Sequence, residues 1–141
     1  MTVSESIFID TAPFIYLIEN NPTYYSKVSN FLIEEFSEKK SIFATSTITF
    51  AEFLVKPKLS NDTKTIDIFK ATIKELNISV FDLTKEIGEQ SAELRAKYKF
   101  LKSFDSIQLA TALHFNCSIL FSNDKVFKKI SDIKTILVDE I

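Results

Sequence analysis

Five short apolar runs, each about as long as a β-strand, constrain the fold of this 141-residue chain most strongly. They are rich in Ile, Val and Phe and lack the alternation of a strand with one solvated face, and segments with helical periodicity separate them. Strands of this kind, each followed by a helix, are typical of a mostly parallel sheet covered on both faces. We expect the strands at about 7–9, 42–44, 78–81, 119–121 and 136–138.

The segments between these runs predict the helices. Pro13 suits a first helical turn, where its missing amide proton is not needed. Pro57 in "VKPKLSND" predicts a break between two helices. The expected helices span 13–19, 23–38, 49–56, 62–76, 85–98, 104–115 and 125–130. The length predicts one α/β domain over residues 1–141, with no linker or repeat.

Charge and hydropathy exclude several classes of protein. A formal net charge of −2 and an isoelectric point near 5.5 argue against a protein that coats duplex nucleic acid through bulk positive charge, so any nucleic-acid contact is expected to be local. We find no apolar run long enough to cross a bilayer and no signal segment, and therefore expect a soluble cytoplasmic protein with no membrane partner. The lone Cys117 supports no intrachain disulfide.

Scarce residue types exclude several chemistries. Gly88 is the only glycine and falls inside an expected helix, which excludes a P-loop and a glycine-rich dinucleotide turn. His114 and Cys117 are the only residues of their types, which excludes a closed His/Cys zinc site and two-histidine RNA cleavage. A Ser-His-Asp triad would need His114, and no nucleophile-elbow sequence accompanies it. Carboxylates, hydroxyls and lysines remain.

Four acids, far apart in the sequence, are expected at one edge of the sheet. Ligands bind outside the carboxyl ends of the strands in open α/β sheets. Asp10 ends the first strand, and Asp124 follows the strand "SILFS". Asp105 begins the helix that leads into that strand, and Glu52 lies in the first turns of the helix after "SIFAT". These acids are candidates for one cluster.

The repulsion within such a cluster indicates that the acids either share protons or hold a divalent cation. Two carboxylates about 4 Å apart repel by roughly 1 kcal/mol at the dielectric constant of water and by about 4 kcal/mol at an effective value near 20. Oxygen ligands without His or Cys favour Mg²⁺ or Mn²⁺. A bound divalent ion would contact phosphate oxygens and activate a water without a histidine base. Hydrolysis of a phosphodiester fits this donor set best.

Each acid also has a structural interpretation. Asp105 suits a helix dipole, although the small residues of "DSIQLATAL" predict close packing on the sheet, and Asp124 suits an N-cap. Glu52 stands in an apolar helix, which favours a buried or ligand-facing position over a surface one. Asp82 follows a strand near the capping residue Thr84 and is interpreted as structural.

The basic stretch "RAKYKFLK" precedes Asp105 directly. It interleaves cations with Tyr98 and Phe100, a pattern that suits single-stranded nucleic acid through phosphate contacts and stacking. The alternative is a helix end whose cations complement the dipole. Lys99 and Lys102 are the candidate RNA-binding residues.

Taken together, these segments resemble the PIN-domain family, most closely the VapC-like ribonuclease toxins. The resemblance covers nearly the whole chain through "IFIDTAPFIYLIENNPTYY", "TSTITFAEFLVKP" and "FDSIQLATALHFNCSILFSND". It implies a three-layer α/β/α fold, Mg²⁺- or Mn²⁺-dependent RNA cleavage to a 3′-hydroxyl and a 5′-phosphate, a homodimer, and an antitoxin partner. The metal-binding and catalytic acids that it implies are Asp10, Glu52, Asp105 and Asp124. The supporting hydroxyl and amide groups that it implies are Thr11, Ser122 and Asn123.

Three other functions fit parts of this sequence. A phosphoacceptor domain needs a further acidic pair near the first strand and a lysine after the last, and "TILVDEI" has none. A haloacid-dehalogenase-like phosphatase needs a second Asp where this chain has Ala12. The stronger alternative is a catalytically inactive PIN-like domain that binds RNA or a protein.

Overall fold

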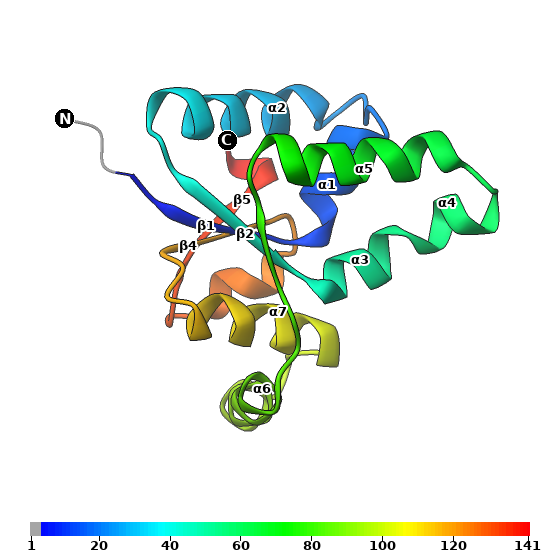
Figure 1. Cartoon of the computed structure of the whole chain (residues 1–141). Coiled ribbons are helices and arrows are strands. Elements are labelled where there is room, and N and C mark those ends of the chain that lie inside the picture. The colour runs from blue at the N-terminus through cyan, green and yellow to red at the C-terminus, as the bar shows by residue number, and fades with distance from the viewer. Residues whose placement is uncertain (1–3) are drawn as a thin grey trace.

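The computed structural model, which describes residues 4–141, has a five-stranded parallel sheet between two layers of helices (Figure 1). The spatial order of the strands is β3-β2-β1-β4-β5. All five expected strands are confirmed, as is the α/β/α architecture. Their bounds are β1 Ser6–Ile9, β2 Ile42–Ser46, β3 Ser79–Phe81, β4 Ile119–Ser122 and β5 Lys134–Leu137.

Helices connect the strands, and each expected helix has a counterpart. The α-helices are α1 Thr11–Ile18, α2 Tyr25–Ile33, α3 Thr47–Phe53, α4 Val55–Leu59, α5 Thr63–Glu75, α6 Lys85–Lys97 and α7 Ser103–His114. A π-helical turn, η1 Glu34–Glu38, extends α2, and two 3₁₀ turns, η2 Lys125–Lys129 and η3 Val138–Glu140, flank β5. Among residues 4–141, no helix is long and apolar enough to span a membrane.

The helix break expected at Pro57 was wrong in its position. The helices α3 and α4 part at Leu54, whose backbone N–H donates to the Phe50 carbonyl, and Pro57 is the third residue of α4. The first four N–H groups of a helix have no partner within the helix, so a proline there removes no hydrogen bond. Pro57 is therefore tolerated inside the helix that it was expected to end.

Both faces of the sheet are buried, which explains why its strands are continuously apolar. Ile7 and Ile9 of β1 belong to a hydrophobic cluster with α1, α2 and α5. Phe8 points to the opposite face and packs with α6 and α7. Figure 1 shows these two groups of helices on opposite sides of the sheet. The burial of each such side chain contributes about 1.5–3 kcal/mol, so the central strand anchors both layers.

The strand order reverses beside β1, and this reversal determines where a site can form. From β1 the chain adds β2 and then β3 on one side, and it returns through α6 and α7 to place β4 on the other side. The connections from β1 and from β4 therefore leave in opposite directions. A crevice forms outside the carboxyl ends of strands at such a point, and Asp10 lies there.

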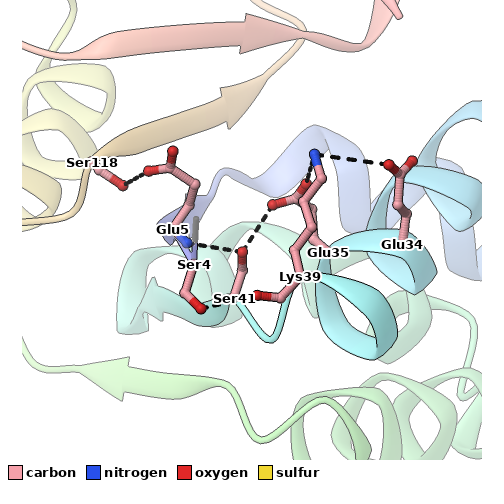
Figure 2. A network of polar contacts seen from close by, with 7 residues as sticks. All are labelled: Ser4, Glu5, Glu34, Glu35, Lys39, Ser41 and Ser118. Carbon is pink, nitrogen blue, oxygen red and sulfur yellow. Dashed lines mark hydrogen bonds and ion pairs between the residues drawn. The ribbon is translucent and has the colours of Figure 1, made fainter. Parts of the chain in front are cut away.

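A network of hydrogen bonds and ion pairs stabilises the opposite side of the sheet, at the edge where the strands begin (Figure 2). The backbone N–H of Glu5 donates to the Ser41 hydroxyl (3.0 Å), and the Ser118 hydroxyl donates to the Glu5 carboxylate (2.6 Å). Ser41 also donates to the buried Glu35 carboxylate (2.9 Å), which pairs with Lys39 Nζ at 2.9 Å. These contacts join the segments that enter β1, β2 and β4 and so help to align the three strands.

Asparagine supplies the left-handed residue at several helix ends. The residues with positive φ all follow a helix, and glycine is the usual residue at such a position. Because Gly88 is the only glycine and lies within α6, other residues adopt this conformation. They are Asn20, Lys40, Asn61, Asn77 and Asn116.

The conformation of Asn77 predicts the effect of substitution. Asn77 has a φ of 52° and follows α5. A left-handed backbone costs an alanine about 1 kcal/mol more than it costs asparagine or glycine. We expect Asn77→Ala to lower the thermal unfolding midpoint by about 4 °C. Asn77→Gly is the matched control and should unfold at or above the temperature of the parent in the same calorimetric scan.

Candidate active site

Asp10 is a buried carboxylate at the end of the central strand. Its backbone N–H donates to the Phe121 carbonyl (2.9 Å), which continues the pairing of β1 with β4 and brings Asp10 beside Ser122. Its side chain caps α1, since Oδ1 accepts from the Thr11 N–H (2.9 Å). Oδ1 also accepts from Gln108 Nε2 (3.3 Å), and Oδ2 accepts from the Ser122 hydroxyl (2.8 Å).

These hydrogen bonds determine what Asp10 can offer to a ligand. Burial raises the pKa of Asp10, while the hydrogen bonds from Ser122, Thr11 and Gln108 oppose that rise. A carboxylate has roughly four lone-pair sites, and protein donors occupy three of them, two on Oδ1 and one on Oδ2. Asp10 can therefore bind a cation through Oδ2 without giving up a protein hydrogen bond.

Asp105, in the first turn of α7, responds to the other three acids. Burial, followed in order of size by the charges of Asp124, Asp10 and Glu52, raises the pKa of Asp105 to about 6, while Lys102 opposes the rise. The four acids that the sequence predicted to meet therefore lie within electrostatic range of one carboxyl group. In a fully solvated acid at a helix start, the pKa would not be raised by three other carboxylates.

Glu52 and Asp124 form the outer part of this acidic site. Glu52 on α3 is exposed, not buried, and its Oε1 accepts from the Thr11 hydroxyl (2.6 Å). Asp124 is also exposed and follows β4. Its Oδ1 accepts from the Val126 N–H (3.0 Å), so it caps η2 as the structural interpretation expected. It therefore combines a capping role with a repulsive charge on Asp105.

The three supporting residues expected from the sequence have different positions. Thr11 bridges to Glu52, and Ser122 donates to Asp10 while accepting from the Asp124 N–H (3.1 Å). Asn123 instead uses its side chain elsewhere. Its amide donates to the Tyr16 hydroxyl (3.1 Å), and its Oδ1 accepts from the backbone N–H of Asp139 (3.0 Å). Asn123 thus joins α1 to η3, and its described hydrogen bonds go to none of the four acids.

Gln108 is a site residue that the sequence argument missed. It lies on α7 with 1% of its surface exposed, and it donates to Asp10 and to the Thr49 hydroxyl (2.8 Å). Its signal in the sequence is a large amide three residues after Asp105, on a helix whose following residues are apolar or small. Such a side chain must find buried partners.

The carboxylate oxygens of the four acids are chemically suited to a hard divalent ion. In the part of the chain that the structure describes, no group of three or more acidic, His or Cys side chains is arranged closely enough to hold a metal. Mg²⁺ keeps several waters and commonly uses one or two carboxylates, so a closed cage is not required. The Lys39 network of Figure 2 shows the contrast, because there a cation pairs directly with the buried Glu35. At the acidic site, Lys102 only partly offsets the negative charge on Asp105.

A basic and aromatic surface lies next to the acidic site. Lys99 and Lys102 are exposed, and Lys102 is close enough to lower the pKa of Asp105. Phe100 and Phe104 expose 42% and 49% of their surfaces, and Lys129 Nζ lies 5.2 Å from the Phe100 ring centroid. Lys97 pairs with Asp132 at 3.3 Å, which removes one cation of the stretch from those available to a ligand.

Fold and site together define an α/β/α domain whose acids gather at the point where the strand order reverses. The model of the PIN domain family matches residues 7–133. The chain belongs to the PIN-domain family. A comparison with curated proteins found no match.

Solved structures of toxin–antitoxin proteins share this fold. A toxin–antitoxin complex from Klebsiella pneumoniae is similar with 26% identity, a TM-score of 0.71 and coverage of 96% of this chain and 99% of that one. VapBC2 from Rickettsia felis, bound to promoter DNA, matches with 18% identity, a TM-score of 0.70 and coverage of 94% and 98%. The sarcin-ricin loop cleaving toxin VapC20 from Mycobacterium tuberculosis matches with 15% identity, a TM-score of 0.68 and coverage of 87% and 93%.

The acidic site should destabilise the protein when no metal is present. Asp105→Asn removes the charge that Asp124, Asp10 and Glu52 repel, and it keeps the size of the side chain. In EDTA at pH 8 we expect the variant to unfold about 3 °C or more above the parent. Asp82→Asn, an exposed change after β3, is the matched control and should leave the midpoint unchanged.

The higher unfolding midpoint of Asp105→Asn should depend on pH, because the pKa of Asp105 is raised. Its folded-state pKa of about 6 lies above the ordinary 3.8, so the folded protein binds more protons between these values. The free energy of unfolding of the parent therefore falls as pH rises from about 4 to 6. The advantage of Asp105→Asn should be complete above pH 6 and shrink toward pH 4. An advantage equally large at pH 4 would contradict the repulsion.

Proposed function

We propose that this protein is a metal-dependent endoribonuclease that hydrolyses RNA phosphodiester bonds as the toxin of a toxin–antitoxin pair. One observation carries the proposal: three carboxylates from separate elements all raise the pKa of a fourth, Asp105. Such repulsion without a matching cation favours a bound divalent ion. The likeness to VapC structures, one of them a sarcin-ricin loop cleaving toxin, supports RNA as the substrate.

The four acids would hold Mg²⁺ or Mn²⁺, with Asp10 and Asp105 as the first ligands and Glu52 and Asp124 completing the set. When bound, the ion activates water and stabilises the leaving oxygen of the phosphate. The protein supplies the positions of the ligands. Ser122 and Thr11 fix the Asp10 carboxylate, and the Thr11 hydroxyl also orients Glu52. Exclusion of water around the buried Asp10 strengthens its attraction for a cation.

The first test separates loss of cleavage from loss of folding. Parent and Asp105→Asn proteins are incubated with a mixed RNA pool in Mn²⁺, and their thermal midpoints are measured with and without the ion. We expect Mn²⁺ to raise the midpoint of the parent, because it binds the native state. Asp105→Asn should lose this rise and cleave at least about 100-fold more slowly.

The stability of the variant makes the outcome clear. Because Asp105→Asn is expected to be at least as stable as the parent in EDTA, its inactivity cannot be ascribed to unfolding. Full cleavage by Asp105→Asn would contradict the assignment of Asp105. A parent that binds Mn²⁺ yet cuts no RNA would favour the alternative, a catalytically inactive PIN-like binding domain.

Single-stranded RNA would reach the acidic site across the basic and aromatic surface. Lys99 and Lys102 can contact phosphates, while the exposed rings of Phe100 and Phe104 can stack with bases. Phe104 and Lys102 flank Asp105 closely in the sequence, so a bound strand would pass the acidic site. The overall charge of −2 makes this local cationic surface the more important for RNA binding.

Charge reversal at this surface should weaken RNA binding. In the Asp105→Asn background, which prevents cleavage, Lys99→Glu and Lys102→Glu should each lower affinity for a short single strand. The slope of log affinity against log salt should fall by about 0.7 for each phosphate that the variant no longer neutralises. Lys64→Glu, an exposed change at the start of α5, is the matched control. Equal affinities and slopes for all variants would exclude this surface as the RNA path.

We also propose two protein partners, an antitoxin and a second copy of the chain. Several of the similar structures are toxin–antitoxin complexes, which supports an antitoxin as partner. An apolar groove of about 390 Å³ between α1, α2 and α5, lined by Leu17, Leu32 and Ile68 among others, offers a surface for such a protein. Val55 and Leu59 on α4 are also exposed, and a second copy of the chain would cover them in the homodimer that the family resemblance implies.

A further inference from the structure

Gln108 connects three parts of the molecule at the buried side of the acidic site. Its amide nitrogen donates to Asp10 Oδ1 (3.3 Å) and to the Thr49 hydroxyl (2.8 Å). Its amide oxygen accepts a short hydrogen bond from the Ser46 hydroxyl. Gln108 therefore joins α7 to the end of β1, the end of β2 and the beginning of α3. These partners lie 98, 62 and 59 residues away in the sequence.

The orientation of the amide follows from its neighbours. The Ser46 hydroxyl oxygen accepts from the Ile48 N–H (3.1 Å), so its single proton is available for the Gln108 carbonyl. The two protons of the Gln108 amide then face Thr49 and Asp10. The reverse orientation would place the amide oxygen against the Asp10 carboxylate, and two acceptors would repel.

A second set of buried groups supports Thr49. The Thr49 and Thr45 hydroxyls are hydrogen-bonded at 2.8 Å, and the Thr45 hydroxyl donates to the Ile9 carbonyl (2.8 Å). Thr45 and Thr49 are fully buried. The hydrogen bonds thus run from the Ile9 carbonyl through both threonines and Gln108 to the carboxylate of the next residue, Asp10. A closed chain of this kind allows Asp10 little freedom to rotate.

We propose that Gln108 is a positioning residue that holds Asp10 Oδ1, so that Oδ2 remains available for a divalent cation. The proposal rests on the proposed function, because it gives Gln108 a role at the same metal site. Without the amide, Oδ1 would lose one of its two donors, so the buried carboxylate would rotate and Oδ2 would shift from the position that it offers to a cation. Both movements would weaken binding of a cation.

A purely structural glutamine would behave differently. Its removal would lower stability as the removal of any buried hydrogen bond does, and it would leave the affinity for a metal unchanged. A residue that orients a ligand affects affinity instead, typically by about 10–100-fold. The ratio of metal affinities therefore distinguishes the two roles better than stability does.

The test measures Mn²⁺ affinity by titration calorimetry with the full chain. Gln108→Met keeps the length of the side chain and removes its donor, and we expect the Kd to rise about 10–100-fold. Gln90→Met, on α6, repeats the same change at the other glutamine of the chain. Ser91→Ala removes a buried hydrogen bond from α6 to Ser106 (2.8 Å), which lies two residues before Gln108 on α7 and whose described hydrogen bonds go to none of the four acids. Both controls should bind Mn²⁺ as the parent does.

Parental affinity in Gln108→Met, or an equal loss in Ser91→Ala, would overturn the positioning role. Should Gln108→Met fail to fold, Ser46→Ala removes the donor that orients the amide and should weaken Mn²⁺ binding several-fold. Unchanged binding in that variant would equally contradict the proposal.

A parent that binds no Mn²⁺ would refute the proposed function, and a metal-free measurement then decides the role of Gln108. Thermal midpoints of Gln108→Met, Asp10→Asn and the double variant in EDTA form a double-mutant cycle. Non-additive shifts are expected from a direct Gln108–Asp10 interaction. Additive shifts would show that Gln108 does not hold Asp10.

Discussion

The burial of the Asp10 carboxylate is the constraint on which the rest of the site depends. A buried charge is stable only when other groups satisfy it, and here the satisfying groups come from three elements. Thr11 opens α1, Ser122 ends β4, and Gln108 reaches across from α7. The Ser122 contact requires the parallel pairing of β1 with β4, and the Gln108 contact requires the packing of α7 on the sheet. Fold and site are therefore specified together.

Negative charge is arranged differently at the two ends of the parallel strands. At the edge where the strands begin, Glu35 is buried and paired with Lys39, so its charge contributes to the fold (Figure 2). At the edge where they end, four carboxylates repel one another, and Lys102 offsets only part of their charge on Asp105. Selection for stability alone would favour carboxylates that are paired with cations, as at the edge where the strands begin. The second edge is therefore where we propose the functional site.

The sequence predicted the strands well, and it predicted that the four acids lie near one another, because both follow from rules that act along the chain. Continuous apolar runs indicate buried parallel strands, and Asp10 is adjacent to one of them. Gln108 was missed because its role depends on partners 59 or more residues away, which no local pattern reveals. The family resemblance implied Asn123 as a supporting amide, but its side chain bonds to Tyr16 and to the Asp139 backbone, because adjacent residues at a strand end point in different directions. Pro57 was misplaced because its tolerance depends on where the preceding helix stops.

The acids also differ in how firmly the protein holds them, and this difference bears on the kind of ion they suit. Asp10 is buried and fixed by three donors, whereas Glu52 and Asp124 are exposed. One buried carboxylate with three protein donors beside two exposed ones suits an ion that keeps part of its water shell and takes few carboxylates directly, as Mg²⁺ does. It also explains why the described residues contain no ready-made group of three ligands. In the proposed function the exposed acids would complete the ligand set, and Asp10 would determine the position of the ion.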